Sequence, residues 1–296
     1  MDLSIAIVSW NVRTLLRECL RSIFENTRGM SFDVFVCDNG SSDGSFEMVK
    51  AEFPQVKLIE NHTNLGFTKA NNLIIKGSTG RYVILLNPDT IVTKDSLATL
   101  VKFMDLRPSA GAVGPKLEYP DGSPQPSCRA FPTLETEIYR TLFLDQVFPS
   151  SPVFGKYLMS CWNHEDVREV DQPMGAALLV RRAAIEGVGS LDEGIFIWYD
   201  EVDWCKRIQD AGWKIYFTPE ALIYHHKNKS FGQWKIKAAL KGALVWRGSR
   251  NYYFRKHHGP LIMVLVNILD AAQIVLVFGL LYVLIRVAAT LIRSVF

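Results

Sequence analysis

The sequence predicts an α/β fold with a mostly parallel sheet, flanking helices and an apolar C-terminal helical segment. Over the first hundred residues, short runs of β-branched and apolar residues alternate with helical patterns. One run, Tyr82–Leu86, is apolar throughout, which is typical of a central parallel strand. Residues 261–285 contain no Lys or Arg and are long enough to form a membrane-length helix.

Taken in order, each predicted strand leads into a helical or turn pattern. The first strand is 3–10, and the helix at 13–24 repeats apolar residues at helical spacing. The further elements are strands at 32–37, 56–60, 82–86, 175–182 and 218–225, and helices at 45–53, 66–76 and from about 200. Residues 111–173 contain eight prolines and are expected to be loop-rich, as a lid, a binding loop or a linker.

The composition excludes several classes of protein. With 296 residues, 48% of them hydrophobic, and 5 Cys, the chain is neither disordered nor a disulfide-rich miniprotein. The cysteines are widely spaced, without a zinc pattern, and are expected to be buried reduced thiols of a cytosolic domain. The N-terminus has no basic region followed by an apolar stretch, so no cleaved signal peptide is predicted.

Charge is distributed unevenly along the chain. The net charge is +3, from 33 Lys+Arg and 30 Asp+Glu, but residues 221–296 hold eleven of the basic residues and a single acidic one, Asp270. We therefore predict a catalytic domain at 1–225, a basic juxtamembrane segment at 226–258 and an apolar membrane-attachment segment at 259–296.

The apolar segment carries a polar stripe, which leaves three interpretations open. Asn267, Asp270 and Gln273 fall at i, i+3 and i+6, and a carboxylate at mid-bilayer is costly. The segment is a span whose stripe faces a partner subunit of a homo-oligomer, an amphipathic helix in the interface, or a buried helix of a soluble oligomer. Either membrane arrangement places the catalytic domain at the inner-leaflet, anionic surface on the cytoplasmic side.

Polar residues directly follow four predicted strands, at the sheet edge where α/β proteins bind ligands. Turn and helix-cap chemistry explains any one group alone, but four groups together favour a nucleotide site. These residues are Ser9, Asn11, Asp38, Asn39, Asn64, Gly66, Asn87 and Asp89. The chain has neither GxGxxG nor GxxxxGK[ST], so we expect a metal on an Asp to neutralise a diphosphate.

Two further groups of titratable residues are candidates for chemistry. Asp200, Glu201 and Asp203 begin a predicted helix among bulky aromatic residues, so they form either a solvated helix start or buried carboxylates with pKa values raised into general-base range. His225 ends a predicted strand and is a core residue, a metal ligand or a diphosphate contact.

Together these segments resemble glycosyltransferase family 2, the inverting enzymes with the GT-A (Rossmann-like) fold, and most closely its bacterial rhamnosyltransferase-like branch. The resemblance rests on several motifs in the family's order. They are 8–11, 38–45, 64–67 with Asn71, 87–89 at the DxD position, 126–133, 175–176 with Arg181, 191–203, His225 and 251–259.

The resemblance implies roles for individual residues. Asp38 would contact the base, and the other nucleotide-binding residues would be Ser9, Asn11, Asn39, Gly66, Asn71 and Asn87. Asp89 and His225 would bind a divalent metal, Mg or Mn, and the diphosphate, and Glu201 would be the general base, with Asp200 as the reserve candidate. The residues on the acceptor and diphosphate side would be Gly175, Ala176, Asp203 and Arg207. Asn87 takes the place of the first Asp of the DxD pattern.

The predicted function is therefore inverting transfer of a sugar, rhamnose in the branch resembled, from a dTDP- or UDP-sugar. The acceptor would be a polyprenyl-linked or other glycan in cell-envelope polysaccharide synthesis, at the cytoplasmic face of the bacterial inner membrane. The basic residues flank an apolar helix rather than a groove, so no nucleic acid is expected as a partner. A nucleotidyltransferase on a similar sheet and an inactive sugar-binding or scaffold subunit are the alternatives.

Overall fold

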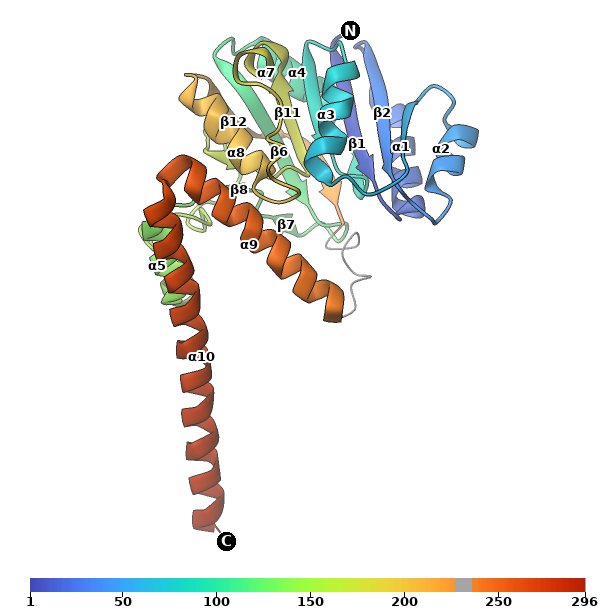
Figure 1. Ribbon diagram of the computed structural model, residues 1–296. Helices are drawn as coiled ribbons and strands as arrows, with labels where there is room; N and C mark the ends of the chain where they lie inside the picture. The colour runs from blue at the N-terminus through green and yellow to red at the C-terminus, as the bar shows by residue number, and fades with distance from the viewer. Residues whose placement is uncertain (227–235, 296) are drawn as a thin grey trace. The chain divides into compact units, whose positions relative to one another are not determined.

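The computed structural model describes residues 1–226 and 236–295 (Figure 1). The chain forms two compact units, the first made of Met1–Phe131 and Trp162–Tyr252 and the second of Pro132–Cys161 and Tyr253–Phe296. This division separates 132–161 from the rest of the catalytic segment predicted at 1–225.

The first unit is built on one large sheet. Its strands, with the small β8–β10 pair, are β1 Leu3–Ser9, β2 Phe32–Asn39, β3 Lys57–Asn61, β4 Tyr82–Leu86, β5 Thr90–Val92, β6 Ala110–Glu118, β7 Pro124–Gln125, β8 Cys128–Arg129, β9 Arg168–Glu169, β10 Gln172–Pro173, β11 Ala177–Arg181 and β12 Lys214–His225. The order is β3-β2-β1-β4-β11-β6-β12-β5. Strands β3, β2, β1 and β4 are parallel, as are β6 and β12, whereas β11 is antiparallel to β4 and β6. The predicted mostly parallel α/β sheet is confirmed.

Helices cover the sheet and bury its central strands. The first unit contains α1 Arg13–Asn26, α2 Ser45–Glu52, α3 Phe67–Gly77, α4 Ser96–Asp105, α7 Arg182–Val188, α8 Asp200–Asp210 and most of α9 Ile236–His258. In α1, Leu16, Cys19, Leu20 and Ile23 recur at helical spacing and are all fully buried. Every residue of β1 is buried, because neighbouring strands and helices enclose it.

The expectation of a loop-rich stretch from residue 111 is wrong at its start. Residues Ala110–Glu118 form β6, which lies between β11 and β12. Its glycines serve close packing: a Cβ on Gly111 would lie 2.6 Å from the Trp213 side chain, and one on Gly114 would lie 2.3 Å from Pro173. A strand that needs glycine for tight contacts looks like a loop in sequence.

The second unit contains α5 Leu134–Thr141, α6 Leu144–Val147 and α10 Pro260–Val295. Within the described residues, α10 is the one helix that is long and apolar enough to cross a membrane, over Pro260–Val277 with a mean hydropathy of 2.2. Many of its side chains are exposed, including Leu261 and Val275. This observation disfavours a helix buried within a single soluble chain.

The polar stripe of α10 makes contacts inside the second unit. Asn267 Nδ2 donates to the carbonyl oxygen of Met263 one turn earlier, at 2.8 Å. Gln273 Nε2 donates to the Arg140 carbonyl oxygen of α5 at 3.3 Å. Asn267 and Gln273 thus have partners within the chain.

Candidate active site

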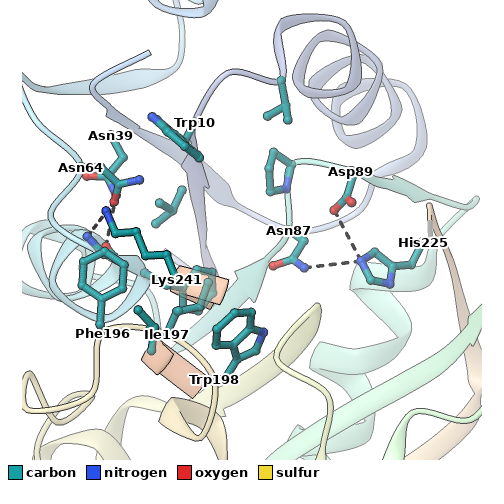
Figure 2. Close-up of a pocket in the computed structure, with 16 residues that line it drawn as sticks. Trp10, Asn39, Asn64, Asn87, Asp89, Phe196, Ile197, Trp198, His225 and Lys241 are labelled. Carbon is teal, nitrogen blue, oxygen red and sulfur yellow. Dashed lines mark hydrogen bonds and ion pairs between the residues drawn. The ribbon is translucent and has the colours of Figure 1, made fainter. Parts of the chain in front are cut away.

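A cavity of about 520 Å³ lies in the first unit at the carboxyl ends of β1, β2 and β4 (Figure 2). The loops after β3 and before α8, the end of β12 and one face of α9 complete it. Its lining residues are Val8, Trp10, Val12, Asn39, Asn64, Gly66, Phe67, Asn87, Pro88, Asp89, Phe196, Ile197, Trp198, His225, Lys241 and Val245. Segments from opposite ends of the sequence therefore share one site.

The ends of β1 and β2 place buried polar atoms beside this cavity. Ser9 and Asp38 are register partners in the two strands. Ser9 Oγ, Asp38 Oδ1 and, on α3, Asn71 Oδ1 are buried and have no hydrogen-bond partner in the part of the chain described. Buried polar groups of this kind are satisfied by a ligand or by water. None of the three lines the cavity directly, although their neighbours Val8 and Phe67 do.

Asn39 has a structural task in addition to its place in the lining. Its Nδ2 donates to Asn64 Oδ1 at 3.0 Å and to the Gly66 carbonyl at 3.2 Å. Its Oδ1 accepts from Leu65 N at 3.0 Å and from Asn61 Nδ2 at 3.1 Å. With both ends of its amide in use, Asn39 fixes the loop between β3 and α3.

Asn11 plays the same kind of role between the loops after β1 and β2. Its backbone amide donates to Ser41 Oγ at 3.0 Å, and its side-chain Oδ1 accepts from Ser42 N at 2.8 Å. Asn11 adopts a left-handed conformation with φ 54°, which Asn tolerates better than most residues. The structure thus joins the first two predicted nucleotide motifs.

Gly66 connects the loop before α3 to the loop before α8. Its φ is +87°, and a Cβ there would lie 2.6 Å from the ring of Phe196 and 2.8 Å from its carbonyl oxygen. Directly beside it, Phe67 N donates to that same carbonyl at 2.9 Å. Only glycine fits this contact without displacing the Phe196 loop.

Asp89, Asn87 and His225 meet on the far side of the cavity from Asn39 (Figure 2). The antiparallel pairing of β5 with β12 sets Thr90 opposite His225. His225 Nε2 lies 3.4 Å from Asp89 Oδ1 and 3.4 Å from Asn87 Nδ2. The buried Asp89 is also held through its carbonyl, which accepts from His226 N at 2.9 Å.

The arrangement around His225 fits a cation. His225 Nδ1 lies 3.0 Å from Gln125 Oε1, an amide oxygen, which can only accept a hydrogen bond from a ring N–H. With Nδ1 protonated, a neutral ring presents its Nε2 lone pair toward the Asp89 carboxylate. Two electron-rich atoms facing each other suit a divalent metal, for which Asp89 and His225 offer an oxygen and a nitrogen ligand. Within residues 1–226 and 236–295, no three His, Cys, Asp or Glu side chains form a complete metal cluster, so other ligands would come from the substrate or water.

Asp200 and Glu201 begin α8 immediately after two residues in a strained conformation. Trp198 and Tyr199 both have left-handed backbones, with φ 59° and 61°. Such conformations are costly for bulky residues and persist where the surroundings impose them. This turn brings Trp198 into the cavity lining and directs Asp200 into the interior, where it is 3% exposed.

The two carboxyls differ in their electrostatics. Burial raises the pKa of Asp200 well above its ordinary value, and the neighbouring charge of Glu201 raises it further. Burial also raises the pKa of Glu201, but the backbone amides of Glu201, Gly175 and Val202 act in the opposite direction. The proton therefore resides preferentially on Asp200, and Glu201 is the carboxylate that ionises first.

Gly175 and Ala176 link Glu201 to the residues near Asp89. Asn87 N donates to the Ala176 carbonyl oxygen at 2.9 Å. A Cβ on Gly175 would lie 3.5 Å from the Cβ of Glu201. The Gly175–Ala176 segment thus lies beside both Asn87 and Glu201, although Glu201 does not itself line the cavity.

Asp203 and Arg207 lie apart from the cavity lining. Arg207 Nε donates to the fully buried Asp203 at 2.8 Å, and its other nitrogens donate to the carbonyls of Val188 and Ser190 at 2.6 and 2.8 Å. These contacts hold α8 against the end of α7. Their predicted place on the acceptor side stays a prediction.

Three residues of the site escaped the sequence analysis. Gln125 lies on the two-residue strand β7, a proline-flanked dipeptide without a strand signal. Lys241 and Val245 of α9 belong to the stretch that we interpreted as a juxtamembrane segment. Lys241 and Val245 are four residues apart, a spacing that signals one helix face, but the sequence does not show what that face covers.

The fold is that of known GT-A glycosyltransferases. A mannosyltransferase from Pyrobaculum calidifontis, solved in complex with GDP-Man and Mn²⁺, matches with a TM-score of 0.55 at 17% identity over 96% of this chain and 80% of that chain. TarS 1-349 of S. aureus matches with a TM-score of 0.54 at 17% identity over 87% and 74% of the two chains. At these identities the likeness establishes the fold.

Sequence relatives define the family. An N-acetylglucosaminyl-diphospho-decaprenol L-rhamnosyltransferase of Mycobacterium tuberculosis is 33% identical over 215 residues, which are 68% of this chain and 68% of that protein. The rhamnosyltransferase WbbL of Escherichia coli is 25% identical over 60% of this chain and 69% of that protein. Residues 4–154 match the family model described as glycosyl transferase family 2. The chain belongs to glycosyl transferase family 2 and is a glycosyltransferase, which confirms the resemblance found in the sequence and leaves the nucleotidyltransferase and scaffold alternatives without support.

Proposed function

We propose that this glycosyltransferase moves rhamnose, with inversion, from a dTDP- or UDP-linked donor to a hydroxyl of a polyprenyl-linked glycan in cell-envelope polysaccharide synthesis. The observation that carries the proposal is the 33% identity, over two thirds of both chains, to an enzyme named as a rhamnosyltransferase for a decaprenol-linked acceptor. The second relative, WbbL, is also named as a rhamnosyltransferase.

The cavity lining is compatible with a deoxy sugar. Rhamnose carries a methyl group where most hexoses carry a hydroxymethyl group. Phe196, Ile197 and Trp198 supply an apolar wall of the cavity. An apolar wall favours a methyl group over a hydroxyl that would lose its hydrogen bonds to water.

In this proposal Glu201 takes the proton from the acceptor hydroxyl as that oxygen attacks the anomeric carbon. General-base catalysis of this kind contributes typically about 10²- to 10⁴-fold. Asp200 remains protonated beside Glu201, so only one negative charge has to be accommodated in the buried pair. Asp38 and Ser9 would bind the nucleoside through their unpartnered buried oxygens.

Asp89 and His225 would hold a divalent metal, Mg²⁺ or Mn²⁺, whose charge would stabilise the leaving diphosphate. Gln125 keeps the His225 ring in one orientation at the end of β12, and the carbonyl of Asp89 accepts from His226 N, so the turn that carries Asp89 is held beside His225. A fixed ligand geometry reduces the reorganisation that metal binding requires.

The apolar helix α10 and the basic residues before it would attach the enzyme to the cytoplasmic face of the bacterial inner membrane. The basic stretch favours anionic lipid, and the exposed apolar side chains of Pro260–Val277 favour the bilayer. A polyprenyl-linked acceptor is confined to the same surface.

The test is a donor panel with a defined acceptor. The full chain in detergent or vesicles is incubated with dTDP-rhamnose, UDP-sugars and GDP-mannose, with and without polyprenyl-diphospho-N-acetylglucosamine. We expect acceptor-dependent release of dTDP or UDP only with the rhamnose donor and only with divalent metal. Equal turnover of a non-rhamnose donor, or no dependence on the lipid-linked acceptor, would contradict the proposal.

A further inference from the structure

Lys241 is the one lysine or arginine among the residues that line the described cavity. No carboxylate in the described ranges forms an ion pair with it, and its side chain is exposed. Figure 2 shows Lys241 extending from α9 toward Asn39 and Asn64, across the cavity from Asp89 and His225. A cation without a protein counter-charge thus lies inside the site.

The helix that carries Lys241 is fastened to the loop before α8. Lys241, Val245, Ser249 and Tyr252 recur at spacings of four, four and three, so they share one face of α9. Ser249 Oγ donates to the Ile197 carbonyl oxygen at 2.8 Å. Tyr252 OH lies 3.2 Å from both carboxylate oxygens of Asp192.

Helix α9 makes two further contacts with the segment before and at the start of α8. Trp246 packs edge-on against Tyr199, with ring centroids 6.2 Å apart. Gly194 leaves room for the Tyr252 ring, because a Cβ there would lie 2.5 Å from it. These contacts fix α9 over the segment that leads to Glu201, and they hold Lys241 over the cavity.

We propose that Lys241 binds the donor phosphate nearest the nucleoside, on the Asn39 and Asn64 side of the cavity, so that the donor site is completed by the helix that precedes the apolar segment. This inference rests on the proposed function for the identity of the donor. A nucleoside diphosphate is an anion, the chain has no glycine-rich phosphate loop, and Asp89 adds negative charge to the lining. A flexible ammonium on a four-carbon stem reaches an anion as a point charge.

One consequence is that donor binding depends on α9 being seated. A change that detaches α9 would remove Lys241 from the cavity. The same change would break the contacts between α9 and the loop before Glu201. Attachment of the chain through its C-terminal part and occupancy of the donor site would then be linked.

The experiment compares full-length Lys241→Met with the wild type and with Arg247→Met. Lys241→Met keeps the aliphatic stem and removes the charge. Arg247→Met removes a cation from the same helix, six residues on and outside the cavity lining. Calorimetry with dTDP, UDP and thymidine measures binding, and thermal melting verifies folding. Lys241→Arg tests rescue by a second cation.

We expect Lys241→Met to bind the nucleoside diphosphate about 10- to 100-fold more weakly, because a charge-assisted hydrogen bond is lost. Thymidine binding and Arg247→Met should be unaffected, and Lys241→Arg should recover most of the affinity. Unchanged affinity in a folded Lys241→Met protein would refute the inference, as would an equal loss for thymidine, which would assign the contact to the nucleoside. If the wild type bound neither dTDP nor UDP, the proposed donor class itself would fail.

Discussion

The paired carboxylates at the start of α8 give the sharpest prediction. Glu201→Gln should lower kcat by about 10²- to 10⁴-fold, which at about 1.4 kcal/mol per tenfold adds roughly 3 to 5 kcal/mol to the barrier. Asp200→Asn should change kcat by less than about tenfold, because a neutral Asn replaces a carboxyl that burial and the Glu201 charge already keep protonated.

The difference in kcat expected between the two variants follows from the surroundings of each carboxyl. Asp200 is 3% exposed and faces charge from both Glu201 and Asp203, whereas the Glu201 carboxylate gains support from the backbone amide of Gly175. Glutamine and asparagine conserve shape, so neither variant opens a cavity in the core.

The assay is single-turnover transfer with saturating donor and acceptor, together with nucleotide binding by calorimetry. Both variants should bind the nucleoside diphosphate like the wild type, since neither side chain lines the cavity. If Asp200→Asn lost as much rate as Glu201→Gln, or if Glu201→Gln kept its turnover, the assignment of the base would be wrong.

Four further predictions concern pH, metal and packing. The raised pKa values of Asp200 and Glu201 mean that the folded protein binds protons more tightly than the unfolded chain. The free energy of unfolding should therefore fall as pH rises from about 4 through the pKa values of the folded protein. The melting temperature of Asp200→Asn should depend less on pH over this interval than that of the wild type. The acid limb of kcat/KM should lie above the ordinary pKa of glutamate, since Glu201 acts deprotonated, and an acid limb at or below that pKa would contradict the burial argument. Asp89→Asn should abolish the increase in donor affinity that Mg²⁺ or Mn²⁺ produces in the wild type, as measured by titration with and without metal; an unchanged increase would remove Asp89 from the metal site. Gly66→Ala should destabilise the fold by about 1 to 2 kcal/mol because its φ is positive, and by about 1 to 3 kcal/mol more because the new Cβ clashes with Phe196. The loss should appear as a lower melting temperature. The control is Gly187→Ala in α7, where no atom lies within 4 Å of the new Cβ, and this variant should be neutral or stabilising.

Much of the fold could be predicted because its signals are local. The alternation of strand and helix patterns through residue 86 located β1 to β4 and α1 to α3, each within a few residues of its observed bounds. Polar residues at strand ends were predicted to share one sheet edge, and the structure places Asn39, Asn87 and Asp89 in one cavity lining. Parallel strands end at the same edge of the sheet, so residues that directly follow these strands in sequence come together in the fold.

Other features depend on contacts between distant segments and leave little local trace. Strand β6 contains two glycines that serve packing against Trp213 and Pro173, so its sequence resembles a loop. Asn39 has the type of a ligand residue, yet its amide is fully engaged in holding the loop before α3.

The sequence by itself determined the fold class, the family and the types of residue available for chemistry, because periodicity and motif order reside in neighbouring positions. Only the tertiary structure decided that Gln125 orients His225, that Asp200 is the more deeply buried of the two carboxyls, and that Lys241 of α9 enters the cavity. These facts depend on burial and on distances between residues far apart in the chain. Such quantities exist only once the chain has folded and excluded water from the site.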